Sequence, residues 1–228
     1  MSATSVDTSP VHANGGAHDP FEMVVPEPGS GPYGPLPADN YPATIVGLLH
    51  VGTQPYTKKD DDGSVTNAER PEIVIILEIA DELEPNSNRP YLFAVKMAMS
   101  LYDKANYYKL MAALLGRKLE SGDKVTARDL LGQPCMAEVK VVPSKDGKKQ
   151  YNNIGTITKL ARGMATPKHT RPLFAWTVFD GTPIPDLSWA PRVFGSPLAD
   201  IIQVSREYRQ GTVHFGEKKA DDDGDIPF

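Results

Sequence analysis

The feature that most restricts the fold of this chain is an alternation of side chains within residues 72–80. Ile73, Ile75, Leu77 and Ile79 point to one side of an extended chain. Glu72 and Glu78 point to the other side. A period of two residues is typical of a β-strand with one face buried and one face in water. We therefore expect a sheet whose acidic face is solvated.

Similar patterns predict four more strands and one helix. The expected strands are residues 43–51, 91–99, 135–142 and 151–160. Apolar residues at helical spacing over 101–115, followed by Gly116, predict a helix that stops at a glycine. Asp146-Gly147 predicts a hairpin turn between the last two strands. Three strands, a helix and two strands is the order of the five-stranded OB barrel, so we expect a mainly β protein of this fold.

Composition divides the chain into four segments. Residues 1–38 hold seven prolines and five glycines, which predicts a disordered arm. Residues 39–163 form the predicted barrel domain. Residues 164–210 combine prolines with aromatic side chains and form a predicted appendage, in which Ser196 caps a helix that starts at Pro197 and runs to about residue 210. Residues 211–228 are predicted to be a flexible acidic tail.

Several classes of protein are not expected. The longest aliphatic run has five residues, whereas a membrane helix needs about twenty, and no secretory signal is visible. The single cysteine, Cys135, predicts a buried thiol in a reducing, cytoplasmic compartment. We expect no metal or cofactor, because the five histidines are scattered and show no ligand spacing. Residues 60–63 with Glu69 resemble a calcium loop, but aligning Gly63 with its invariant glycine places Lys58 at the first ligand position, where an acid is required. No motif for catalysis is present, so an enzyme is not expected.

The net charge of −5 is unevenly distributed along the chain. Residues 1–40 contain five acids and no lysine or arginine, and residues 217–228 contain five acids and two lysines. Residues 41–216 therefore hold 22 basic and 19 acidic residues, a charge of +3. The overall sign does not argue against a nucleic-acid partner, because the middle of the chain is basic.

The last eight residues carry the most specific motif. An acidic run, Asp221 to Asp223, precedes Asp225-Ile226-Pro227-Phe228. A flexible acidic string that ends in apolar residues and a carboxylate is suited to a partner pocket with a basic rim. The alternative is a solubilising tail.

This ending resembles the C-terminal tip of bacterial single-stranded DNA-binding proteins, with Gly224 as an interruption. The resemblance implies that Asp221, Asp222, Asp223, Asp225, Ile226, Pro227 and Phe228 recruit replication, recombination and repair proteins and compete with DNA. Residues 130–135 and 151–154 are similar to phage- or plasmid-encoded members of this class. The long arm and the appendage depart from the cellular proteins, so tetrameric assembly is in doubt, although a homo-oligomer is possible.

Binding of single strands needs cations for phosphates and aromatic rings for bases. An OB barrel presents both on strands two and three and on the loops between strands 1–2 and 4–5. The predicted DNA-binding residues are Tyr56, Lys58, Lys59, Tyr91, Phe93, Lys96, Lys140, Lys145, Lys148, Lys149 and Tyr151. Core packing is the alternative for Tyr91 and Phe93, and an ordinary solvated hairpin is the alternative for the lysines.

The sequence thus favours a non-enzymatic protein that coats single-stranded DNA without strong sequence preference during replication, recombination or repair, in a bacterium or a phage-infected cell. The alternative is an adaptor or inhibitor whose acidic ends imitate DNA and which does not bind DNA itself.

Overall fold

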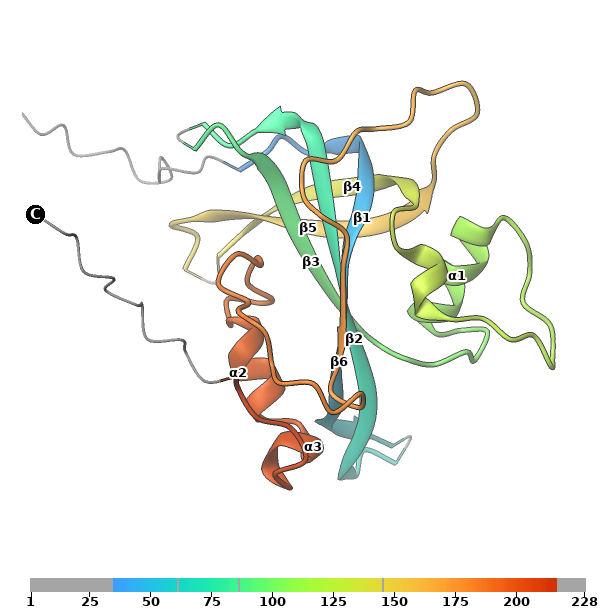
Figure 1. The fold of residues 1–228 in the computed structure, drawn as a ribbon, viewed down its shortest axis with the longest axis vertical. Helices are drawn as coiled ribbons and strands as arrows, with labels where there is room; N and C mark the ends of the chain where they lie inside the picture. Colours follow the sequence, from blue (N-terminus) through green and yellow to red (C-terminus); the bar gives the residue numbers. More distant parts are fainter. Residues whose placement is uncertain (1–34, 61, 86, 145, 217–228) are drawn as a thin grey trace, which may run out of the picture.

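The computed structural model describes residues 35–60, 62–85, 87–144 and 146–216. A six-stranded sheet forms the centre of this part of the chain (Figure 1). Its strands are β1 (Asp39–Lys59), β2 (Val65–Leu83), β3 (Pro90–Ala98), β4 (Pro134–Pro143), β5 (Gln150–Lys159) and β6 (Phe174–Thr177). The mainly β class and the five predicted strands are confirmed, whereas β6 was not predicted.

The long strand β1 connects all parts of the sheet. Its first six residues pair with β4, and residues 44–59 pair with β2. Residues 47–50 also pair with β6, in the only parallel arrangement among the described strands. The order β3-β2-β1-β4-β5 begins and ends on strands that do not pair with each other within the described chain. The sheet is therefore open, and a closed five-stranded barrel is not confirmed.

The predicted helix between the third and fourth strands is present as α1 (Asn106–Leu115). It begins later than the apolar spacing indicates, because Leu101 is exposed and precedes the helix. Gly116 ends it in the left-handed region with φ of 70°, as predicted, and its N–H reaches the carbonyls of Ala112 and Ala113. A short 3-10 helix, η1 (Ala127–Leu130), leads into β4. No helix in the described residues is long and apolar enough to span a membrane.

Strand β2 is buried on both faces, which corrects the prediction of a half-buried strand. Ile73 and Ile75 belong to a first core, which α1 closes. Val74 and Ile76, on the opposite face, belong to a second core. The acidic residues that predicted a solvated face, Glu72 and Glu78, are also buried.

The second core lies under residues 174–215, which cover the face of the sheet opposite α1 (Figure 1). Trp176, Leu198 and Ile202 are among the side chains that this segment buries. Burial of this apolar area at about 25 cal/mol per Å² is the main source of stability for such a layer. Val213 is buried as well, so the packing extends into the segment whose sequence predicts a tail.

Two short helices, α2 (Leu198–Gln203) and α3 (Arg206–Arg209), replace the single helix predicted to start at Pro197. Pro197 is the N-cap of α2, so Ser196 does not cap it. Ser205 separates the two helices, and its hydroxyl accepts a hydrogen bond from the N–H of Tyr208. A serine that caps a new helix competes with continuation of the old one, which explains the break.

Candidate nucleic-acid interface

The β4–β5 hairpin is a basic part of the chain. Residues 134–162 contain six basic and two acidic side chains. Tyr151 lies opposite Val142, and Asn153 lies opposite Lys140. Since opposite residues of an antiparallel pair share a face, these four side chains form one surface. The Tyr151 side chain is 51% exposed there, so its ring is accessible to a ligand.

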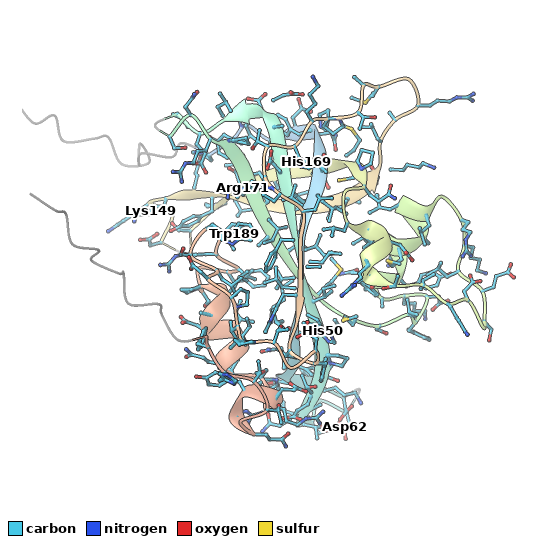
Figure 2. All side chains as sticks on the ribbon, viewed as in Figure 1. His50, Asp62, Lys149, His169, Arg171 and Trp189 are labelled. Atoms are coloured by element: carbon cyan, nitrogen blue, oxygen red, sulfur yellow. The ribbon has the colours of Figure 1, made fainter. Side chains whose placement is uncertain are left out.

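The lysines of this hairpin surround that surface. Lys140 forms an exposed ion pair with Glu138 at 3.3 Å. Lys148 and Lys149 are exposed, and their ammonium groups form no ion pair within the described chain. Figure 2 shows Lys149 at the end of the hairpin, directed away from the sheet. Lys145 lies outside the described residues.

Asn152 anchors the other face of the hairpin. Its amide oxygen accepts a hydrogen bond from the N–H of Leu36, and its amide nitrogen donates one to the Leu36 carbonyl, both at 2.7 Å. The Asn152 amide thus pairs with the Leu36 backbone as the backbone of a neighbouring strand would, and it holds Leu36 in the first core. Val139 and Ile154 also pack against this core. The face that carries Tyr151 therefore has a rigid base.

The candidates in the β1–β2 hairpin lie in a different electrostatic setting. Residues 56–70 contain three basic and four acidic side chains. Lys58 pairs with Asp60 at 2.6 Å, and the guanidinium of Arg70 lies 4.4 Å from the centre of the Tyr56 ring. Lys59 is exposed. In Figure 2, Asp62 lies at the bottom of the molecule and Lys149 lies on its left side, so the two hairpin tips are at different places on the molecule.

The candidates on β3 contact the protein itself. Tyr91 is buried in the first core, and Phe93 packs against it, with the two rings nearly parallel at 6.1 Å. Lys96 lies on the opposite face, where its ammonium pairs with Glu72 at 2.5 Å. Glu72 also accepts a hydrogen bond from Arg70 at 2.9 Å. Core packing, the alternative considered for the two aromatic residues, is the arrangement observed.

Glu78 binds the appendage to the sheet. One carboxylate oxygen accepts hydrogen bonds from the N–H and hydroxyl of Thr170, at 2.6 and 3.0 Å. The other oxygen accepts the N–H of Arg171 at 3.2 Å. The Arg171 guanidinium in turn lies over the Trp189 ring at 5.5 Å. The sequence signal for this contact was an acidic residue in the middle of an apolar strand, because a carboxylate that is buried there needs hydrogen-bond donors.

Glu207 of α3 makes the second buried contact of this kind. Its two carboxylate oxygens accept the N–H and the hydroxyl of Thr53, at 2.8 and 2.7 Å. Burial, the largest influence, raises the pKa of Glu207, but the hydrogen bonds from Thr53 and the charge of Arg206 outweigh it and the net pKa is lowered. Gly52 makes room for this contact at a bulge in β1, with φ of 88°. The carboxylate therefore holds α3 on the sheet in its ionised form.

A cavity of about 390 Å³ lies between β1, β6, α1 and η1. Apolar side chains such as Leu48, Met99 and Tyr107 line it, together with the polar groups of His50 and Arg128. Burial lowers the pKa of His50, and its buried Nε2 has no hydrogen-bond partner within the described chain. Burial also raises the pKa of the Cys135 thiol to about 12. No group of three or more His, Cys, Asp or Glu side chains in the described residues is arranged to hold a metal ion.

No family model and no curated protein sequence matches this chain. The predicted partner-binding residues at positions 221–228 lie outside the described residues.

Proposed function

We propose that this protein binds single-stranded DNA without strong sequence preference, as a non-enzymatic member of the OB class. The strand order β3-β2-β1-β4-β5, with α1 between β3 and β4, supports an OB architecture that is open between β3 and β5. The described residues bring together cations and an exposed ring, the two groups that such binding needs.

The observation that carries this proposal is the β4–β5 hairpin. Tyr151 offers a half-exposed ring to a base, and Lys148 and Lys149 offer charges to the adjacent phosphates. The register places Lys140 on the same face as Tyr151. The DNA strand therefore lies along this hairpin, whereas Tyr91, Phe93 and Lys96 stabilise the fold from β3.

The C-terminal residues supply the second part of the proposed function. Asp225-Ile226-Pro227-Phe228 recruits proteins of DNA replication, recombination and repair, in a bacterial or phage-infected cell. The acidic residues Asp221 to Asp223 compete with DNA for the lysines of the hairpin, because both ligands are anionic. DNA binding then releases the tip for its partners.

Titration with oligo-dT at low and high salt, followed by intrinsic fluorescence, tests the binding. We expect quenching and an affinity that falls steeply with salt. Replacing both Lys148 and Lys149 with alanine should reduce the slope of log K against log salt by about 1.4, because each phosphate contact on a single strand contributes roughly 0.7. Lys104→Ala with Lys118→Ala is the matched control, since both side chains are exposed and lie outside the hairpin.

Tyr151→Ala should weaken binding by about 5- to 150-fold, the range for loss of one stacked base. The salt slope should stay unchanged, because no charge is removed. Equal losses in the control pair and the hairpin pair would contradict the assignment of the surface. Absence of binding at low salt would instead favour the alternative function, an adaptor that imitates DNA. The five acidic residues within residues 1–40, where lysine and arginine are absent, support that alternative.

A further inference from the structure

A tight turn in the appendage holds an aromatic residue in a conformation that aromatic residues rarely adopt. Val193 and Ser196 exchange two backbone hydrogen bonds, both of 2.9 Å, so Phe194 and Gly195 are the two residues of the turn. Both have positive φ values, 49° and 85°. Turns of this kind favour Asn-Gly, since asparagine tolerates the left-handed region and a bulky side chain is strained there.

The Phe194 side chain is also the most exposed large apolar group in the described chain, at 83%. Its neighbours are firmly placed, because Val193 and Leu198 are both buried in the second core. The guanidinium of Arg192 donates a hydrogen bond to the Gly195 carbonyl at 2.9 Å and braces the turn. The ring is therefore presented to solvent on a rigid support.

Within the described chain, phenylalanine at position 194 gains no stability that offsets its strain and its exposure. The strain of the left-handed conformation and the exposure of an apolar ring both oppose it, and asparagine would remove both. A residue that breaks a local rule without an evident structural gain is a candidate for function.

The chemistry around the turn indicates the ligand. Residues 187–199 contain Arg192 and no acidic residue. Arg192 is exposed and uses one of its five N–H groups on the turn, so its other N–H groups can donate to a phosphate. The guanidinium binds the carbonyl of Gly195, the residue that follows Phe194. An exposed ring and a cation in one turn fit one nucleotide, with the base on the ring and the phosphate on the cation.

We propose that Phe194 is a second stacking platform for single-stranded DNA, with Arg192 contacting the adjacent phosphate. This inference rests on the proposed function and deepens it, because it makes the appendage part of the DNA-binding surface. The DNA strand then contacts both the β4–β5 hairpin and the turn at residues 193–196.

Phe194→Asn tests the proposal, and Phe194→Tyr is its matched control. Asparagine should weaken oligo-dT binding by about 5- to 150-fold with the salt slope unchanged, whereas tyrosine should retain the affinity. An oligonucleotide with abasic sites throughout should bind the wild type and Phe194→Asn equally. The melting temperature of Phe194→Asn should equal or exceed that of the wild type, because the strain is relieved.

Three results would overturn the inference. If the wild type binds oligo-dT and Phe194→Asn binds it equally well, the proposed function stands and the stacking role fails. A lower melting temperature for Phe194→Asn would assign the ring to folding. A change in oligomeric state with unchanged DNA affinity would assign it to an interface between copies of the chain. Failure of the proposed function is separate, since the wild type itself would then not bind.

Discussion

Gly52→Ala tests whether the contact between Glu207 and Thr53 holds the appendage on the sheet. A Cβ atom at position 52 would lie 2.6 Å from Oε2 of Glu207 and 2.8 Å from Cβ of Ser205. Both distances are shorter than real contacts allow, and φ of 88° is unfavourable for alanine. The substitution must therefore displace α3 from β1.

The expected loss of stability has two parts. The left-handed backbone conformation costs alanine about 1–2 kcal/mol. Displacement of Glu207 removes two hydrogen bonds to a buried carboxylate, which contribute roughly 1.5–3 kcal/mol each. Because α3 can shift and keep part of this interaction, we expect a total loss of about 4 kcal/mol in the free energy of unfolding.

Gly63→Ala is the matched control for this measurement. Gly63 has nearly the same φ, 84°, but an added Cβ would have no atom within 4 Å. Only the backbone part of the loss, about 1–2 kcal/mol, should remain. Urea denaturation of the two variants and the wild type gives the comparison, with the slope m checked for a change in the cooperative unit.

Equal destabilisation by the two substitutions, to within about 0.5 kcal/mol, would refute the reasoning, since the contact at Gly52 would then carry no energy. Glu207→Gln provides an independent measurement that leaves the backbone unchanged. It should lower the stability by about 1–2 kcal/mol at neutral pH, because an amide replaces one acceptor oxygen with a donor.

Three further predictions concern other parts of the chain. The pKa of His50 is lowered by burial from its ordinary value of 6.5, so its contribution to stability is complete above pH 6.5 and decreases as the pH falls toward the folded pKa. His50→Phe should remove this dependence from melting curves. The Cys135 thiol, with its pKa raised to about 12, should not react with a thiol reagent at pH 8 until the protein unfolds, and rapid labelling of native protein would contradict its burial. Deletion of residues 221–228 should tighten oligo-dT binding and abolish capture of partner proteins, and unchanged DNA affinity would exclude competition by the tail.

The strands and the helix were predictable because their signals are local. Alternation in β2, the Asp146-Gly147 turn and the stop at Gly116 each depend on neighbouring residues only. Strand β6 was missed because residues 174–177 are too short for a visible period and pair with β1, far away in the sequence. The break between α2 and α3 was missed because Ser205 continues the helical spacing of Leu198, Ile201 and Ile202, and its role as the N-cap of α3 is visible only in the folded chain.

The candidate site was predictable in part. The sequence located the basic hairpin with Tyr151, because the lysines and the turn signal are adjacent there. It could not show which face of β3 points inward, so Tyr91 and Phe93 remained undecided between core and surface. The exposed ring of Phe194 had no sequence signal, because its φ and its exposure exist only in the folded chain.

The sequence by itself determined the order of the first five strands and α1, the uneven distribution of charge and the acidic C-terminal motif. The tertiary structure alone decided what covers each face of the sheet. Glu72 and Glu78 predicted water on the outer face of β2, yet the appendage covers this face. Arg70 and Lys96 of the sheet pair with Glu72, and Thr170 and Arg171 of the appendage donate hydrogen bonds to Glu78. A periodic pattern records that a side chain is polar, whereas its environment depends on long-range contacts that can bury a carboxylate once donors surround it.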